Sequence, residues 1–251
     1  VAGILCTNGA APVIRNTVVE QNQGGIRIYD SRPSLDRCLI RSNYSGRGAG
    51  ILIEGNSQPY LVNTLIIGNN STNDSGGIYV GAGSSPTGMN CTVANNTASN
   101  RGSAITTEGA PVFRNTIVWG NTDPASDPID LKAAATFTYS CAQEFHPGTG
   151  NKTNDPLFVG GGVYALQTGS PCIDSGTSVG APVIDYAGYP RPLDGDNSGT
   201  AAFDMGAFEY AASYSDTDDD GMPDEWEILN GLNPVSSNAP STNLDGDWMT
   251  D

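Results

Sequence analysis

The segment Pro12-Val-Ile-Arg-Asn-Thr-Val-Val-Glu-Gln-Asn22 recurs along the first half of the chain and decides the fold. Each copy has Pro, three residues, Asn or Arg, Thr or Cys, four residues and a final Asn, and the other copies are residues 33–43, 59–69, 86–96 and 111–121. Successive prolines are 21, 26, 27 and 25 residues apart. A fixed period of this length indicates a solenoid, in which each repeat forms one coil.

A second motif, a small residue followed by Ile, lies between these segments. Its members are Ile4, Ile26, Ile51, Ile78 and Ile105, and the residues two positions later are Cys6, Ile28, Ile53, Val80 and Thr107. Such alternation predicts short strands, and each strand must stack on its copy about 4.8 Å away to bury its apolar face. We expect an apolar Ile column with two companions, Ile14/Leu35/Leu61/Phe113 and Val18/Leu39/Leu65/Ile117. The predicted fold class is all-β, a right-handed parallel β-helix of about five coils.

The final asparagines of the repeat predict a ladder at one turn of the coil, formed by Asn22, Asn43, Asn69, Asn96 and Asn121. Stacked amides hydrogen-bond from coil to coil, and Asn tolerates the left-handed backbone that such a turn needs. Insertions gather after this turn, at residues 44–49, 71–76 and 97–103. They form either a binding face or tolerated surface loops.

Charge is concentrated at the end of the chain. The net charge is −16, and residues 192–251 hold 14 of the 27 acidic side chains and no basic one. Since no basic patch exists to neutralise phosphates, nucleic acid is not an expected partner. No apolar run is long enough for a membrane span. Because neither an initiator Met nor a signal peptide is present, we expect a mature, processed or partial chain.

Several motifs then resemble known families. The Asn-Thr-apolar and Gly-Gly-Ile coils look like the pectate-lyase-like β-helix superfamily, and residues 115–121, 139–141, 155–158, 169–174 and 204–210 resemble the β-helix end of bacterial surface proteins of the choice-of-anchor type. This resemblance covers about residues 1–212 and implies an exported protein at the bacterial cell surface or outside the cell. We divide the chain into β-helix coils at 1–135, an irregular C-terminal end of the β-helix at 136–212 and a calcium-binding segment at 213–251.

The acidic tail predicts a Ca²⁺ site followed by a short helix. Acidic residues occupy loop positions 1, 3, 5, 9 and 12 of residues 216–227, with Gly221 at position 6, which is the EF-hand arrangement of oxygen ligands around a sharp turn. The segment resembles thrombospondin type 3-like and dockerin-like repeats, which implies side-chain ligands at Asp216, Asp218, Asp220, Asp224 and Glu227 and a carbonyl ligand at Met222. A truncated second copy supplies half a site at Asn243, Asp245, Asp247 and Asp251.

Other reactive side chains give weaker signals. Asp194, Asp196 and Asp204 form another acidic cluster, either a metal site or a plain turn. Among the five cysteines, Cys141 and Cys172 are candidates for pairing in an oxidising compartment. Cys38 and Cys91 lie two coils apart, too far for a disulfide, and Cys6 is expected in the core. The single histidine, His146, has no accompanying nucleophile motif, which excludes a catalytic triad.

Two classes of function remain open. The first is a structural or adhesive surface protein that is stabilised by Ca²⁺, binds surface glycans or assembles end to end into filaments. The second is a calcium-assisted polysaccharide lyase or carbohydrate-binding module. A lyase needs charges that converge across adjacent coils. Here Arg15, Arg37 and Arg114 are interrupted by other residues, so we predict no catalytic residues and lean towards the structural class.

Overall fold

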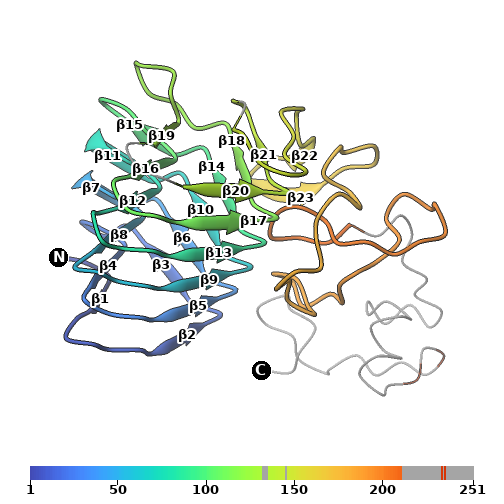
Figure 1. Cartoon of the computed structure of the whole chain (residues 1–251), viewed down its shortest axis with the longest axis horizontal. Helices are drawn as coiled ribbons and strands as arrows, with labels where there is room; N and C mark the ends of the chain where they lie inside the picture. The colour runs from blue at the N-terminus through green and yellow to red at the C-terminus, as the bar shows by residue number, and fades with distance from the viewer. Residues whose placement is uncertain (132–134, 145, 211–232, 234, 236–251) are drawn as a thin grey trace.

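Each repeat contributes one strand to each of three parallel sheets (Figure 1). The structure, a computed structural model, describes residues 1–131, 135–144, 146–210, 233 and 235. The first sheet holds β1 (Ile4–Cys6), β4 (Ile26–Tyr29), β8 (Ile51–Glu54), β12 (Ile78–Val80), β16 (Ile105–Thr107) and β19 (Ile129–Leu131). The second holds β2 (Val13–Arg15), β5 (Ser34–Asp36), β9 (Tyr60–Val62), β13 (Thr87–Met89), β17 (Val112–Arg114) and β20 (Thr136–Thr138). The third holds β3 (Val18–Glu20), β6 (Leu39–Arg41), β10 (Leu65–Ile67), β14 (Thr92–Ala94), β18 (Ile117–Trp119) and β21 (Cys141–Ala142).

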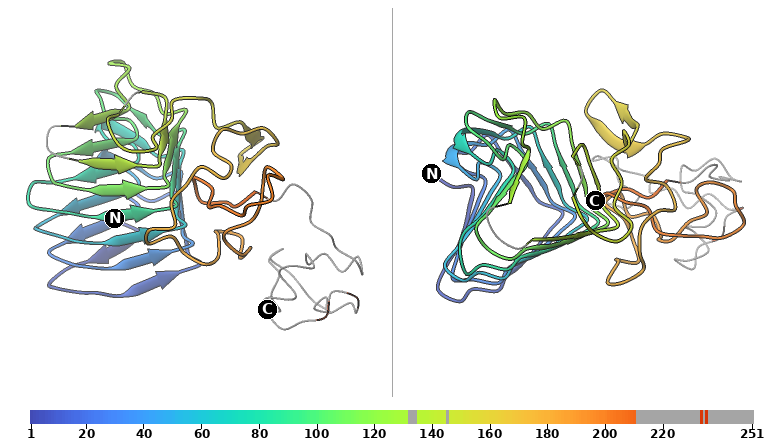
Figure 2. Two further views of the ribbon diagram at one scale, coloured as in Figure 1. Left: turned by 45° about the vertical axis from the view of Figure 1, so that its right-hand side comes forward. Right: turned by 45° about the horizontal axis from the view of Figure 1, so that its top comes forward.

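The registers match the sequence repeat residue by residue. Ile4 pairs with Ile26, Ile51 with Ile78, and Ile78 with Ile105. The six strands of each sheet define five turns of the solenoid, stacked along one axis as Figure 2 shows. The predicted fold class, a parallel β-helix of about five coils, is therefore confirmed.

The core confirms two of the three expected apolar columns. The Ile column is fully buried from Ile26 to Ile105, and Leu35, Leu61 and Phe113 are buried beside it. The third column was predicted one position too early. Val18 is 54% exposed, whereas its neighbour Val19 is 4% exposed and begins the inward column, which continues through Ile40, Ile66, Val93 and Val118. Successive side chains of a strand point to opposite faces, so two adjacent apolar residues leave the inward face undecided in the sequence.

The asparagine ladder is present as expected. Asn43 donates its side-chain amide to Asn69 Oδ1 at 3.0 Å, Asn69 donates to Asn96 at 2.9 Å, and Asn96 donates to Asn121 at 2.9 Å. The left-handed backbone is not on the ladder residues, contrary to expectation. It falls one position earlier, at Gln21, Ser42, Gly68, Asn95 and Gly120. The bend made there turns the next amide inward, where it bonds along the stack.

The inserted segments form a fourth, smaller parallel sheet. Its strands are β7 (Tyr44–Arg47), β11 (Asn70–Asp74) and β15 (Thr97–Ala98). The insertions pack over the outer face of the first sheet, where Tyr79 is only 2% exposed. The Arg47 guanidinium lies 4.7 Å from the centre of the Tyr79 ring, a cation–π contact. This corner therefore covers the coils as well as extending them.

After the last coil the chain becomes irregular and lies along one flank of the solenoid, from yellow to orange in Figures 1 and 2. Its strands are the antiparallel pair β22 (Phe158–Gly160) and β23 (Val163–Leu166). Throughout the described residues there is no α-helix, and hence none long and apolar enough to cross a membrane. The predicted calcium loop and helix at 216–232 and the half-site at 243–251 lie outside the described residues.

Candidate functional site

Residues 170–210, here called the C-terminal cover, dock on three coils through one column of asparagines. Asn63 donates its side-chain amide to Ile184 O at 2.8 Å, and Asn90 donates to Asp204 O at 3.0 Å. Asn115 donates to Thr177 O and accepts from Thr177 N, both at 2.8 Å. These asparagines have φ between 46° and 49°, a left-handed conformation that Asn adopts more readily than most residues. The Asn-or-Arg position of the repeat therefore carries the docking contacts.

Apolar packing completes the docking. Ile117, Cys141, Leu166, Cys172, Ile173 and Met205 form a buried cluster distinct from the main core. Ile117 and Cys141 belong to the outward column of the third sheet that begins with the exposed Val18. The cover thus buries the outer face of the third sheet at β18 and β21, in the later coils, whereas Val18 in the first coil stays exposed.

Inside the cover, three carboxyl groups surround a single guanidinium. Arg191 donates to Glu209 Oε2 at 2.6 Å, and both side chains are fully buried. Burial raises the pKa of Asp204 to about 8, with the nearby Glu209 adding to the effect, and burial raises the pKa of Glu209 to about 7. Burial also raises the pKa of Asp185. This network is enclosed, so it shapes the cover and offers no surface for a ligand.

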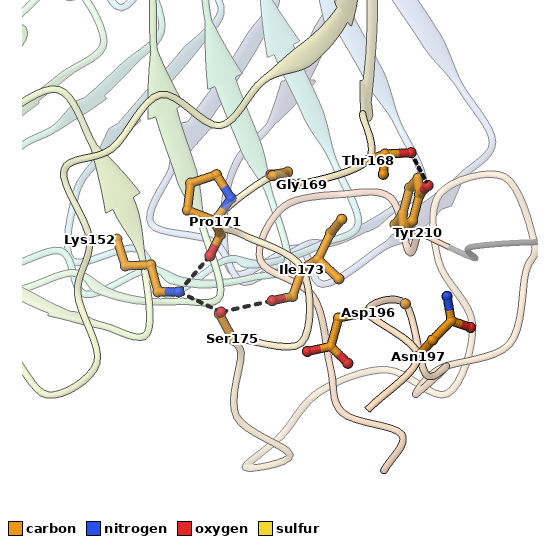
Figure 3. A pocket seen from close by; sticks show the side chains of 11 residues that line it. Lys152, Thr168, Gly169, Pro171, Ile173, Ser175, Asp196, Asn197 and Tyr210 are labelled. Carbon is orange, nitrogen blue, oxygen red and sulfur yellow. Dashed lines mark hydrogen bonds between the residues drawn. The ribbon is translucent and has the colours of Figure 1, made fainter. Parts of the chain in front are cut away.

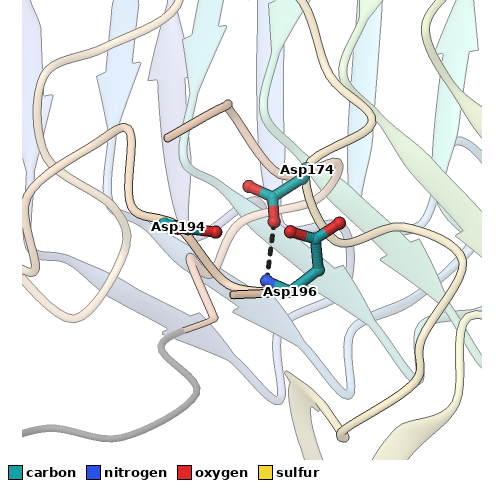
Figure 4. A group of neighbouring side chains, drawn as sticks. All are labelled: Asp174, Asp194 and Asp196. Atoms are coloured by element: carbon teal, nitrogen blue, oxygen red, sulfur yellow. Dashed lines mark hydrogen bonds between the residues drawn. The ribbon is translucent and has the colours of Figure 1, made fainter. Parts of the chain in front are cut away.

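The structure brings Asp194 and Asp196 together with Asp174, a residue that the sequence pattern does not single out (Figure 4). One carboxylate oxygen from each lies within 4.8 Å of the others. Asp204, the expected third member, is buried in the neighbouring network, where it accepts a hydrogen bond from Asp174 N at 2.8 Å. Burial raises the pKa of Asp174, whereas hydrogen bonds from Ser198 lower the pKa of Asp196.

Backbone amides hold this acidic loop in shape. Asp194 accepts from Ser198 N at 3.0 Å and from Gly199 N at 2.8 Å, and Asp174 accepts from Asp196 N at 2.8 Å. The order Asp, x, Asp, x, Ser, Gly places oxygen atoms at alternate positions before a glycine with φ +86°, the first half of an EF-hand-type pattern. The donor set is one that a hard divalent cation prefers.

A polar hollow of about 480 Å³ adjoins the acidic loop and shares Asp196 with it (Figure 3). Its other lining residues include Lys152, Thr168, Ser175, Asn197 and Tyr210. Lys152 donates to Pro171 O and to Ser175 Oγ, each at 2.5 Å, and the Thr168 and Tyr210 hydroxyls lie 2.5 Å apart. A cation, a carboxylate, hydroxyls and an aromatic ring are together the groups that bind sugars.

A second polar group, on the first sheet, is likewise absent from the sequence-based candidates. Glu54 and Glu108 occupy one outward column with Gly81 between them, as the bonds from Gly81 N to Ile53 O and from Glu108 N to Val80 O show. A Cβ at Gly81 would lie 3.1 Å from Glu54 Cγ. Burial, and then the hydrogen bond with Glu108, raise the pKa of Tyr79 to about 12. The repeat contains a signal for this column. Glu54, Gly81 and Glu108 each directly follow one of the equivalent, paired residues Ile53, Val80 and Thr107 of the first sheet.

The remaining sequence candidates are packed side chains. His146 is half-buried against the Phe137 ring, with centroids 5.5 Å apart, and burial lowers its pKa. All five cysteines are buried free thiols, so Cys141 and Cys172 are not bonded to each other in this structure. Cys6 lies in the core, as predicted. Arg15 and Arg114 are separated in their column by Asp36, Val62 and Met89, as expected.

The model of the protein family described as the right-handed β-helix region matches residues 1–174, more than half of the chain. The chain belongs to this family. No curated protein and no solved structure gives a significant match. The family of right-handed β-helices thus accounts for the coils, whereas Asp194 and Asp196 lie after the matched region and the hollow is lined from both sides of its end.

Proposed function

We propose that this right-handed β-helix protein is a structural element of the bacterial cell surface or its exterior, stabilised by Ca²⁺. The observation that carries the proposal is the unbroken stack: apolar columns and an amide ladder run in register through the coils. Such a stack makes a stiff rod from short, similar repeats, and the C-terminal cover ties three of its coils together.

Calcium is proposed from the chemistry of the acidic residues. The loop from Asp216 to Glu227 carries the ligand pattern in the sequence, and the half-site from Asn243 to Asp251 repeats its start. Within the described residues, the carboxylates of Asp174, Asp194 and Asp196 stand at separations compatible with shared coordination at about 2.4 Å per oxygen. Bound Ca²⁺ would neutralise part of an otherwise strongly acidic end.

Thermal unfolding with millimolar Ca²⁺ and then with a chelator tests this proposal. We expect Ca²⁺ to raise the melting temperature, because a ligand that binds only the folded state stabilises it. Two double variants distinguish the two acidic loops: Asp218→Asn/Asp220→Asn in one and Asp194→Asn/Asp196→Asn in the other. Ca²⁺ should no longer raise the melting temperature of the variant whose loop is the binding site. An identical melting temperature with Ca²⁺ and chelator in the unmutated chain would overturn the calcium proposal.

Self-association is the partner that we propose for the rod. Parallel coils pair through their backbones, so a second copy docked on an end coil would extend the same three sheets, and repeated head-to-tail contacts of this kind give a filament. Light scattering on the 251-residue chain should show mass growing with protein concentration. A constant monomer mass with and without Ca²⁺ would remove this partner.

The polar hollow favours a second candidate, a carbohydrate-binding module or calcium-assisted polysaccharide lyase. Lys152 offers a cation for a uronate carboxylate, and Tyr210 offers a ring and a hydroxyl. Calorimetry with uronate oligosaccharides should show weaker binding for Tyr210→Phe, whereas Tyr164→Phe, outside the hollow, should bind normally. Ultraviolet-absorbing unsaturated products would establish the lyase, and the absence of both binding and products would exclude the candidate.

A further inference from the structure

Opposite charges line the polar hollow, and Lys152 supplies the positive one. Its ammonium donates to Pro171 O and to Ser175 Oγ, and the Ser175 hydroxyl in turn donates to Ile173 O at 2.8 Å. These contacts fix the end of a long, flexible side chain. An ammonium group has three N–H donors, so one of them is left for a ligand in the hollow.

Asp196 supplies the negative charge. Its Oδ1 accepts from Ser198 N at 2.9 Å, and its own N–H donates to Asp174 Oδ2 at 2.8 Å. The hydrogen bonds from Ser198 lower the pKa of Asp196, so this carboxyl group is ionised at neutral pH. The carboxyl groups of Asp174 and Asp194 lie beside it and add to the negative potential at this side of the hollow.

The rest of the wall is partly apolar and partly hydroxylic (Figure 3). Ile173 and Tyr210 line the hollow, and both pack into the second buried cluster, which holds the Tyr210 ring in place. The Tyr210 hydroxyl lies 2.5 Å from Thr168 Oγ1. A fixed ring of this kind can pack on one face of a sugar while its hydroxyl bonds to the sugar hydroxyls. The volume of about 480 Å³ is typical of small-molecule sites.

The balance of charges restricts the ligand. A ligand that carries only a carboxylate would gain the Lys152 ammonium but would lie close to three carboxyl groups. Like charges at short range repel, whereas an ammonium group on the ligand would be attracted to the same carboxyl groups. A ligand that carries both charges therefore fits this hollow better than an anion alone.

We propose that the hollow binds a zwitterionic sugar, one that carries a carboxylate and an ammonium group on the same molecule. Lys152 binds the carboxylate, Asp196 binds the ammonium group, and the Tyr210 ring packs on the sugar. This inference rests on the second candidate function, and it narrows the ligand from acidic sugars to sugars that also carry a positive charge.

An NMR titration of the full chain with three matched monosaccharides tests the proposal. The probes are galacturonic acid, which has the carboxylate, galactosamine, which has the amine, and galactosaminuronic acid, which has both. The titration is run at low salt with a chelator present and at about pH 6, where both ligand groups and Asp196 are ionised. We expect galactosaminuronic acid to bind roughly tenfold more tightly than either of the other two.

Two outcomes would overturn the inference: galacturonic acid that binds as tightly as galactosaminuronic acid, or binding of none of the three. Uronate oligosaccharides, the probe of the second candidate function, then show separately whether that function stands. Binding of the oligosaccharides without a preference for the zwitterion would leave the candidate function standing and remove only the narrower ligand class.

Three variants assign the two charges. Asp196→Asn keeps an oxygen for the hydrogen bond from Ser198 N but removes the negative charge, so galactosaminuronic and galacturonic acids should bind alike. Lys152→Gln keeps a donor but removes the positive charge, so galactosaminuronic acid and galactosamine should bind alike. Glu20→Gln, which removes an exposed carboxylate on the first coil, is the control and should leave all three affinities unchanged. A preference for the zwitterion that survives Asp196→Asn would contradict the proposal.

Discussion

Asn90 donates its side-chain amide to the carbonyl of Asp204, 114 residues further along the chain, at 3.0 Å. The contact joins the fourth coil to the C-terminal cover. Asn90 Oδ1 also accepts from Asn115 at 3.1 Å, so one buried amide links two coils and the cover. The same repeat position in the first coil, Asn16, has an exposed side chain and a nearly identical φ, 47° against 49°.

This pair provides a direct test of the docking. Asn90→Gly keeps the left-handed backbone accessible but removes the amide, and we expect the free energy of unfolding to fall by about 2 kcal/mol. Asn16→Gly makes the same chemical change without losing a docking contact and should change it by less than about 0.5 kcal/mol. Urea denaturation measures both. Equal losses would mean that the backbone, not the docking, determines the cost.

The ladder should be most sensitive in its middle. Asn69 Oδ1 accepts from both the backbone N–H and the side-chain amide of Asn43, and Asn69 donates to Ile40 O, all out of contact with water. Asn69→Ala leaves these buried groups of Asn43 and Ile40 without a hydrogen-bond partner, and should lower the free energy of unfolding by about 3 kcal/mol. Asn22→Ala, at the half-buried end of the ladder, should cost about 1 kcal/mol. Denaturation midpoints that fall equally for both would contradict a cooperative ladder.

Gly88 and Phe113 form a size-compensating pair in one column. A Cβ at Gly88 would lie 2.5 Å from Phe113 Cδ1, so the ring fills the space that the glycine leaves. We expect Gly88→Ala to destabilise by about 2 kcal/mol through overpacking, and Phe113→Leu by about 2 kcal/mol through a cavity. In the double variant the smaller Leu leaves room for the added Ala methyl group. Its loss of stability should therefore be clearly less than the sum of the two single losses. Additive losses in this double-mutant cycle would show that the two positions are independent.

The enclosed carboxyl groups predict a pH dependence. Asp204 and Glu209 have pKa values of about 8 and about 7 in the folded protein, raised above the ordinary value of about 4 chiefly by burial. The protonated forms therefore favour folding, and their contribution is lost as the pH rises through 7 and 8. Unfolding free energy should fall by about 1 kcal/mol or more between pH 5.5 and pH 8.5.

Asp204→Asn provides the matching variant. It cannot ionise, so its stability should vary less over this range. The stability falls overall, because one of the two carboxylate oxygens that accept from Asp174 N and Tyr210 N is replaced by an amide nitrogen, which cannot accept. Urea titrations at a series of pH values measure both effects. A stability that is constant or rises from pH 5.5 to pH 8.5 in the unmutated chain would contradict the raised pKa values.

The coils were predictable because their residues recur in register. The period of the repeat alone places Ile26, Ile51 and Ile78 in one column, and their pairing follows from the stacking of equivalent strands. The choice between Val18 and Val19 was not predictable. Both are apolar, and their column counterparts Leu65 and Ile66 are both buried, since the cover packs on the outer face of the upper coils.

The candidate site was only partly predictable. Asp194 and Asp196 are close in sequence and were found together, but Asp174 reaches them from another loop of an aperiodic segment. No repeat indicates where such a segment folds back. The predicted ligands from Asp216 to Glu227 lie outside the described residues and stay a prediction.

The one-sided position of the cover has a mechanical consequence. It binds Asn63, Asn90 and Asn115, whereas none of its hydrogen bonds among the described residues reaches the first two coils. A force applied at Val1 would therefore peel these coils away one after the other, each releasing roughly 80 Å of extended chain. The next three coils are all bound to the cover, so they must unfold together. Unfolding the third coil should therefore need a much larger force than unfolding the first two.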